Sequence, residues 1–177
     1  RPAAKEQVAS LGAKFVAIED DEFKAAETAG GYAKQMSPEY QAKQADLTAK
    51  HIAKQDIVVT TALIPGRAAP ILVTKEMVET MRPGSVIIDM AAARGGNCPL
   101  AEAGKVVEHN GVKIAGYTDL PGRLPADASS LYAKNLVTFL PLITAASGEI
   151  SFDTEDEIVA AMLLTANGET VNERIKS

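Results

Sequence analysis

The chain has 177 residues, of which 46% are hydrophobic and 23% charged, which is an ordinary composition for a globular protein. Its net charge of −5 comes from interspersed acidic and basic residues, so no basic patch favours nucleic acid as a partner. No apolar run reaches the ~18 residues that a spanning helix needs, and direct membrane insertion is not expected. The single cysteine excludes an internal disulfide, and the two distant histidines give no metal-ligand spacing.

The first third of the chain predicts a helix, a strand and a long loop. Arg1–Gly12 is typical of a helix, with Gly12 suited to its end, and Ala13–Ile18 is typical of a strand. A chain that starts inside a helix, with no strand before it, is expected to come from a longer sequence. Glu19–Gln35 is polar and has no clear hydrophobic period, which predicts a long loop. Loops of this length in compact domains are usually functional or disordered.

The next part of the chain predicts two successive strands, each followed by a loop of small residues. Ser37 and Pro38 predict a helix start, with the helix running to about Lys54. Asp56–Thr60 is an apolar, β-branched run that breaks into small residues and Pro-Gly, which is typical of a buried parallel strand. Thr74 predicts the cap of a helix to about Met81, and Ser85–Asp89 predicts the next strand.

The remaining elements complete an α/β pattern. Asn110-Gly111 lies between two short apolar runs and predicts a hairpin, so the order of elements favours a parallel sheet with covering helices. A Pro- and Gly-rich corner then precedes a long helix over 126–146, which Pro141 is expected to kink or end. The tail 149–177 predicts a short capped helix at 153–158 and a turn at 167–168.

The residues alone do not identify the ligand that binds at the edge of this sheet. Ligands bind outside the carboxyl ends of parallel strands, but the dinucleotide fingerprint G-x-G-x-x-G is absent, so it either precedes Arg1 or no dinucleotide binds. Asp89 is expected to bind loop amides rather than act in catalysis, and Cys98 has no nearby base. Tyr32, beside a glycine pair and near Met36, is expected either to cover a flat ligand or to anchor its loop.

Several motifs, in order, resemble one family. They are 30–34 with Met36, 60–66, Met81 with 84–89, 95–98, and 116–125 continuing to 131–136. Together they resemble the NAD(H)-binding domain of the proton-translocating NAD(P) transhydrogenase, in its alpha subunit, over essentially all 177 residues. The related alanine dehydrogenases usually have Cys directly after Gly-Gly, where this chain has Asn97, and Asn-Met-Pro-Gly where it has Asp119-Leu120-Pro121-Gly122.

The resemblance implies a fold and a division of the chain. The fold is α/β, a Rossmann-like parallel sheet with covering helices, incomplete at its N-terminus, plus a long crossing helix and part of a second Rossmann-like lobe. Residues 1–124 are the later part of the nucleotide lobe, 125–147 the connecting helix and 148–177 a segment of the second lobe.

The resemblance also implies an activity. The chain is expected to hold NAD(H) while hydride passes directly to or from NADP(H) on a partner domain, coupled to proton translocation by a membrane domain. It implies a homodimer on the cytoplasmic face of the bacterial inner membrane, or the matrix side in mitochondria, with no metal and no catalytic acid or base. The chain alone is expected to be inactive. Two alternatives remain open: an NAD-dependent amino-acid dehydrogenase of the alanine type, and a non-catalytic fragment.

The nucleotide contacts that the resemblance implies are seven. Arg1 corresponds to a residue near the adenosine, Tyr32 to a tyrosine that folds over the nucleotide, and Leu63 to a contact at the adenine side. The complete set is Arg1, Gly31, Tyr32, Gln44, Thr61, Ala62 and Leu63.

Overall fold

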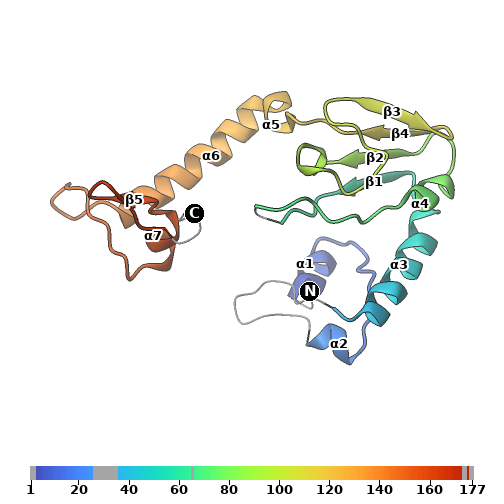
Figure 1. Cartoon of the computed structure of the whole chain (residues 1–177), viewed down its shortest axis with the longest axis horizontal. Helices are drawn as coiled ribbons and strands as arrows, with labels where there is room; N and C mark the ends of the chain where they lie inside the picture. Colours follow the sequence, from blue (N-terminus) through green and yellow to red (C-terminus); the bar gives the residue numbers. More distant parts are fainter. Residues whose placement is uncertain (1–2, 26–35, 65, 173–174, 176–177) are drawn as a thin grey trace. The chain divides into compact units, whose positions relative to one another are not determined.

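The computed structural model describes residues 3–25, 36–64, 66–172 and 175, and it divides into two compact units, 1–119 and 120–177 (Figure 1). Unit 1 contains α1 (Ala3–Ser10), α2 (Asp21–Lys24), α3 (Pro38–Ile52), β1 (Ile57–Thr60), α4 (Lys75–Glu79), β2 (Val86–Asp89), η1 (Ala92–Arg94), β3 (Val106–His109) and β4 (Val112–Ala115). Unit 2 contains α5 (Leu120–Arg123), α6 (Pro125–Phe139), η2 (Leu140–Leu142), α7 (Glu157–Met162), β5 (Thr165–Ala166) and β6 (Glu169–Thr170).

A four-stranded sheet organises unit 1, in the order β1-β2-β4-β3 (Figure 1). β1, β2 and β4 run parallel, with Val58 opposite Ile87 and Ile87 opposite Ile114. β3 pairs antiparallel with β4 through the predicted hairpin, where Asn110 and Gly111 both have positive φ. The carboxyl ends of β1 and β2 therefore lie next to each other, and the predicted α/β fold with a parallel sheet is confirmed.

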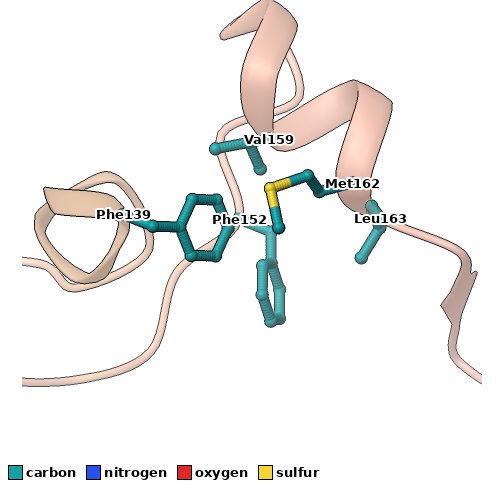
Figure 2. A pocket seen from close by; sticks show the side chains of 5 residues that line it. All are labelled: Phe139, Phe152, Val159, Met162 and Leu163. Carbon is teal, nitrogen blue, oxygen red and sulfur yellow. The ribbon is translucent and has the colours of Figure 1, made fainter. Parts of the chain in front are cut away.

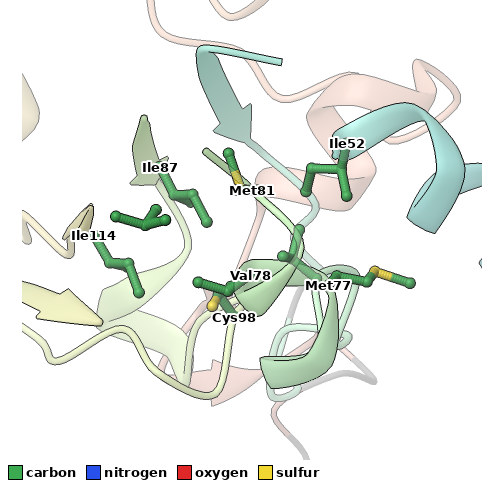
Figure 3. Close-up of a cluster of buried hydrophobic side chains, with 9 residues drawn as sticks. Ile52, Met77, Val78, Met81, Ile87, Cys98 and Ile114 are labelled. Atoms are coloured by element: carbon green, nitrogen blue, oxygen red, sulfur yellow. The ribbon is translucent and has the colours of Figure 1, made fainter. Parts of the chain in front are cut away.

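One face of the sheet packs against α3 and α4. Figure 3 shows side chains of β2 and β4 directed toward those of α4 and the end of α3. The cluster consists of Ile52, Val73, Met77, Val78, Met81, Ile87, Cys98, Val112 and Ile114. Burial of this apolar area supplies most of the favourable free energy that holds the sheet and its helices together.

The predicted helix caps are present. The Ser37 side chain accepts a hydrogen bond from the Tyr40 amide at 3.1 Å, and the Thr74 side chain accepts one from the Met77 amide at 3.3 Å. Each bond satisfies an amide that the first turn of a helix leaves without a partner. Both helices therefore begin where the sequence places their caps.

The N-terminal part differs from the prediction in two places. The strand predicted at 13–18 is wrong. These residues do not form a strand, and no described strand pairs with them. The predicted loop 19–35 contains the short helix α2, which Asp20 caps through the Phe23 amide. The buried Phe23 ring lies against Phe15, with centroids 6.1 Å apart, and this contact stabilises the turn.

In unit 2, α6 is shorter than predicted and none of its side chains is buried. It ends at Phe139 and does not continue to Ala146. The expectation that Pro141 would kink or end the helix is confirmed, because proline lacks the amide that would continue it. The predicted turn forms the β5–β6 hairpin, with positive φ at Asn167 and Gly168. Among the described residues, no helix combines the length and apolarity needed to cross a membrane.

Candidate functional site at the carboxyl ends of β1 and β2

Two loops meet at the carboxyl edge of the sheet, where β1 and β2 end side by side. The backbone joins them directly, since the Met90 amide donates to the Thr60 carbonyl at 3.0 Å. Thr61 and Leu63, which follow β1 directly, are both exposed, and 55% of the Leu63 surface is accessible to solvent. The sheet thus presents an apolar side chain and a hydroxyl at the edge where open α/β sheets bind ligands.

Asp89, the last residue of β2, anchors the second of these loops. It is fully buried, and its Oδ1 accepts a hydrogen bond from the Ala91 amide at 2.9 Å. Its Oδ2 accepts bonds from the amides of Asn97 and Cys98 at 2.7 and 2.9 Å. Three backbone donors compensate the buried carboxylate. The prediction that Asp89 binds loop amides is confirmed.

Asn97 connects this second loop to the first. The side chain is fully buried; its Oδ1 accepts from the Ala62 amide at 3.1 Å, and its Nδ2 donates to the Ala62 carbonyl at 2.9 Å. Nδ2 also donates to the Pro70 carbonyl at 2.8 Å. The Asn97 carbonyl accepts from the amides of Leu72 and Val73 at 2.8 and 3.1 Å. One side chain and its own peptide groups therefore hold the loop after β1 at both of its ends.

Gly96 allows the close approach of Asp89 to the loop backbone. Its φ is +78°, in the region that side chains rarely adopt, and a Cβ placed on it would lie 2.9 Å from Asp89 Oδ2. Any larger residue would therefore strain the backbone and displace the carboxylate. The glycine directly before Asn97 is required by this geometry.

Cys98 is a core residue in the described structure. Its side chain is fully buried and belongs to the hydrophobic cluster of unit 1. Burial raises the pKa of the Cys98 thiol, and the nearby Asp89 carboxylate acts in the same direction. The thiol is therefore neutral at pH 7, and the arrangement gives it no nucleophilic role.

The sequence-predicted contacts fall into three groups. Thr61, Ala62 and Leu63 are contiguous in the loop after β1, whereas Gln44 lies on the exposed surface of α3. In the part of the chain that the structure describes, no hydrogen bond joins the Gln44 side chain to that loop. Arg1, Gly31 and Tyr32 lie outside the described residues, as does most of the loop predicted to cover a ligand.

The two chain segments that flank residues 26–35 are bonded to each other. Ser37 Oγ donates to Glu22 Oε2 at 2.7 Å, and the Ser37 amide donates to Glu22 Oε1. The buried Tyr40 donates its hydroxyl proton to the Ile18 carbonyl at 3.0 Å. The described segments on either side of this gap are therefore joined by hydrogen bonds between Glu22 and Ser37. No pattern in the sequence indicated this contribution of Glu22.

Apolar cavities occur in both units. In unit 2, Figure 2 shows Phe139 of α6 and Met162 of α7 lining one cavity together with Phe152, Val159 and Leu163. In unit 1, a second cavity lies between α3 and β1 and is lined by Thr48, His51, Ile52, Gln55, Ile57, Val58, Thr60, Leu72 and Val73. No cluster of three or more His, Cys, Asp or Glu side chains that could hold a metal occurs among the described residues.

A family profile decides the relationship of the chain. The profile of the alanine dehydrogenase/PNT C-terminal domain matches residues 1–173. The chain belongs to this family. It is 53% identical to an NAD(P) transhydrogenase alpha-subunit polypeptide of Rhodospirillum rubrum over 173 residues, which are 97% of the chain and 45% of that protein. It is 48% identical to NAD(P) transhydrogenase subunit alpha of Haemophilus influenzae, again over 97% of the chain but 33% of the relative.

Solved structures of this family agree with the relationship. The transhydrogenase of Sinorhizobium meliloti is 56% identical and superimposes with a TM-score of 0.75, over 97% of the chain and 43% of that structure. An L-alanine dehydrogenase is 25% identical with a TM-score of 0.60, over 98% of the chain and 48% of the structure. The resemblance to transhydrogenase alpha subunits is confirmed, and alanine dehydrogenase is a more distant relative. The chain spans less than half the length of these proteins.

Sequence reasoning missed the role of Asn97 at this site. Asn97 was named there as part of a motif and as a departure from alanine dehydrogenases, although the residue carries the bonds that join the two loops. The available signal was a polar amide between two glycines and a core cysteine, after a strand that ends in aspartate. A polar residue in such an apolar, tightly turning stretch is normally buried with its hydrogen bonds satisfied.

Proposed function

We propose that this chain forms part of the NAD(H)-binding component of a proton-translocating transhydrogenase. The single observation that carries the proposal is its 53% identity, over 97% of its length, to a transhydrogenase alpha subunit. In this role the protein holds NAD(H) while hydride passes to or from NADP(H) on a partner domain, and a membrane domain couples that transfer to proton movement. We place it at the cytoplasmic face of the bacterial inner membrane, or the matrix face in mitochondria, as a peripheral homodimer.

In this proposal residues 1–124 belong to the nucleotide lobe, 125–147 connect the lobes and 148–177 belong to the second lobe. The contacts to the nucleotide come from Arg1, Gly31, Tyr32, Gln44, Thr61, Ala62 and Leu63. Gly31 and Tyr32 belong to the segment between Glu22 and Ser37, two residues that are hydrogen-bonded to each other.

The described part of the site suits the adenosine end of a dinucleotide. Leu63 offers an exposed apolar side chain for a flat base, and Thr61 offers an exposed hydroxyl. Both Ala62 backbone groups are already bonded to Asn97, so Ala62 contributes shape rather than hydrogen bonds to the ligand. Bound NAD(H) supplies the hydride chemistry; the residues of this chain bind and orient it, because holding two reactants in a fixed geometry itself accelerates a transfer.

A reconstitution assay tests the proposed reaction. The complete natural polypeptide that carries this sequence is mixed with NADPH and an NAD analogue, with and without an NADP(H)-binding partner domain. We expect transfer only in the combined sample, because one nucleotide site cannot hold both rings. Full turnover by the polypeptide alone would refute the two-component mechanism.

The same preparation separates the alternatives. NADH production from alanine and NAD would select an amino-acid dehydrogenase, in line with the more distant relatives. Absence of any NADH binding by calorimetry, in a folded protein, would leave a non-catalytic interaction module.

A substitution at Leu63 tests the position of the site. Leu63→Asp places an unpaired carboxylate against the ligand and should weaken NADH binding by about 1–3 kcal/mol. Leu131→Asp in unit 2 is a suitable control, since Leu131 is similarly exposed, at 65% against 55%. Unchanged affinity of the folded Leu63 variant would place the adenosine elsewhere.

A further inference from the structure

Every polar group of Asn97 is engaged within the protein. Its amide donates to Asp89, its carbonyl accepts from Leu72 and Val73, and its side chain bonds Ala62 and Pro70. The side chain cannot reach out to a ligand without losing these bonds. Any influence on a ligand must therefore pass through the backbone that it holds.

That backbone carries the proposed nucleotide contacts. The side chain of Asn97 forms a two-bond pair with Ala62, which lies between Thr61 and Leu63. Its third side-chain bond, to Pro70, fixes the other end of the same loop. The peptide that sets the direction of Leu63 is therefore held by a side chain 35 residues further along the chain.

Asn97 is itself held in place by Asp89 and Gly96. The Asp89 carboxylate bonds its amide at 2.7 Å, and Gly96 provides the space and the backbone conformation for that bond. Buried networks in which each member is satisfied hold one conformation, because any alternative leaves a polar group unpaired in the interior.

We propose that Asn97 is a positioning residue for the nucleotide: it holds the loop after β1 in its binding conformation before the ligand arrives. This inference rests on the proposed NAD(H) site. Preorganisation of a loop favours binding because the ordering entropy has already been lost in folding. The effect is confined to the adenine side that the resemblance assigns to Leu63.

The first test is Asn97→Ala in the complete natural polypeptide that carries this sequence. We expect the dissociation constants of NADH and ADP-ribose to rise roughly tenfold. The dissociation constant of nicotinamide mononucleotide, which lacks the adenine side, should stay unchanged. In the reconstituted assay the KM for the NAD(H) analogue should rise, with kcat at saturation unchanged.

Asn172→Ala is the matched control. Asn172 is also a buried asparagine whose Nδ2 bonds two backbone carbonyls, those of Ala161 and Leu163, but it lies in unit 2. Its substitution should leave all nucleotide affinities unchanged. If folded Asn97→Ala binds NADH as tightly as the wild type, or loses adenine-side and nicotinamide-side affinity equally, the positioning role is refuted.

A second measurement keeps the proposal testable if Asn97→Ala does not fold. Hydrogen exchange of the wild type should show the Ala62 amide protected without nucleotide, with no further change when NADH is added. An Ala62 amide that exchanges freely until NADH binds would overturn the proposal. A wild type that binds no NADH would refute the proposed function itself, which separates the two failures.

Discussion

Unit 1 buries many of its apolar side chains, whereas the long helix of unit 2 exposes its own. The unit 1 sheet has fully buried side chains on adjacent strands, Ile87 and Ile114, and a buried polar network at its edge. In α6, no side chain is buried, and Leu131, Tyr132 and Val137 are each about two-thirds exposed. Similar apolar residue types thus stabilise the first region and contribute little packing to the second.

This contrast predicts where substitutions should affect stability. A helix of 15 residues is marginal without packing, because most helical stability in proteins comes from a buried face. In unit 1 the packing is present in the described structure, so changes there should alter a cooperative transition. Changes on α6 should have small effects on that transition.

The largest expected effect is at the centre of the unit 1 core. Ile87→Ala should lower the free energy of unfolding of unit 1 by about 2–5 kcal/mol, because it leaves a cavity between the sheet and α4. Leu131→Ala on α6 should change it by less than about 0.5 kcal/mol. Chemical denaturation followed by circular dichroism measures both, and equal losses would contradict the contrast between the regions.

Gly96 should be the next most sensitive position. Gly96→Ala should cost about 1 kcal/mol more than Gly104→Ala, because both glycines have φ of +78° but only Gly96 has Asp89 within 3 Å of the added methyl group. Gly148→Ala in unit 2, also at positive φ and in open space, gives a second reference. Thermal unfolding of the three variants tests the ranking. Equal costs would mean that Asp89 can move without penalty.

Substitutions at the helix caps test the contrast between unit 1 and unit 2 with smaller expected effects. Thr74→Ala should lower the stability of unit 1 by about 1 kcal/mol, whereas Thr74→Ser, which keeps the hydroxyl, should restore most of it. Asp156 caps α7 through the amides of Ile158 and Val159. Asp156→Ala should speed hydrogen exchange within α7 and leave the unit 1 transition unchanged. A shift of that transition would show that the two units unfold together.

The smallest expected effect is the pH dependence contributed by Cys98. Because burial raises the pKa of this thiol in the folded state, the unfolded chain loses its proton first as pH rises. The stabilisation is thus fully present below the ordinary thiol pKa of about 8.5 and is lost at higher pH. Stability of unit 1 should fall less steeply from pH 8 upward in Cys98→Ala than in the wild type. Identical slopes would contradict the shift.

Local sequence signals predicted much of the secondary structure correctly. The caps at Ser37 and Thr74 and the hairpin at 110–111 follow from interactions between near neighbours in the chain. The parallel strands β1 and β2 were predicted from their apolar, β-branched runs, although their pairing joins distant segments. The strand predicted at 13–18 shows the limit of this reasoning. A strand is completed by the backbone of another segment, and the propensity of its own residues does not supply that partner.

Sequence patterns and the family resemblance were sufficient to identify the family, the α/β order of elements and the residues after β1 as a candidate contact region. How that region is held depends on contacts between segments that are distant in the chain. The bonds from Asn97 to Ala62 and from Glu22 to Ser37 join residues 35 and 15 positions apart, a separation that no periodicity encodes. Periodic patterns record which face of an element is buried, whereas a side chain's hydrogen-bond partners depend on which distant backbone groups the fold brings within about 3 Å.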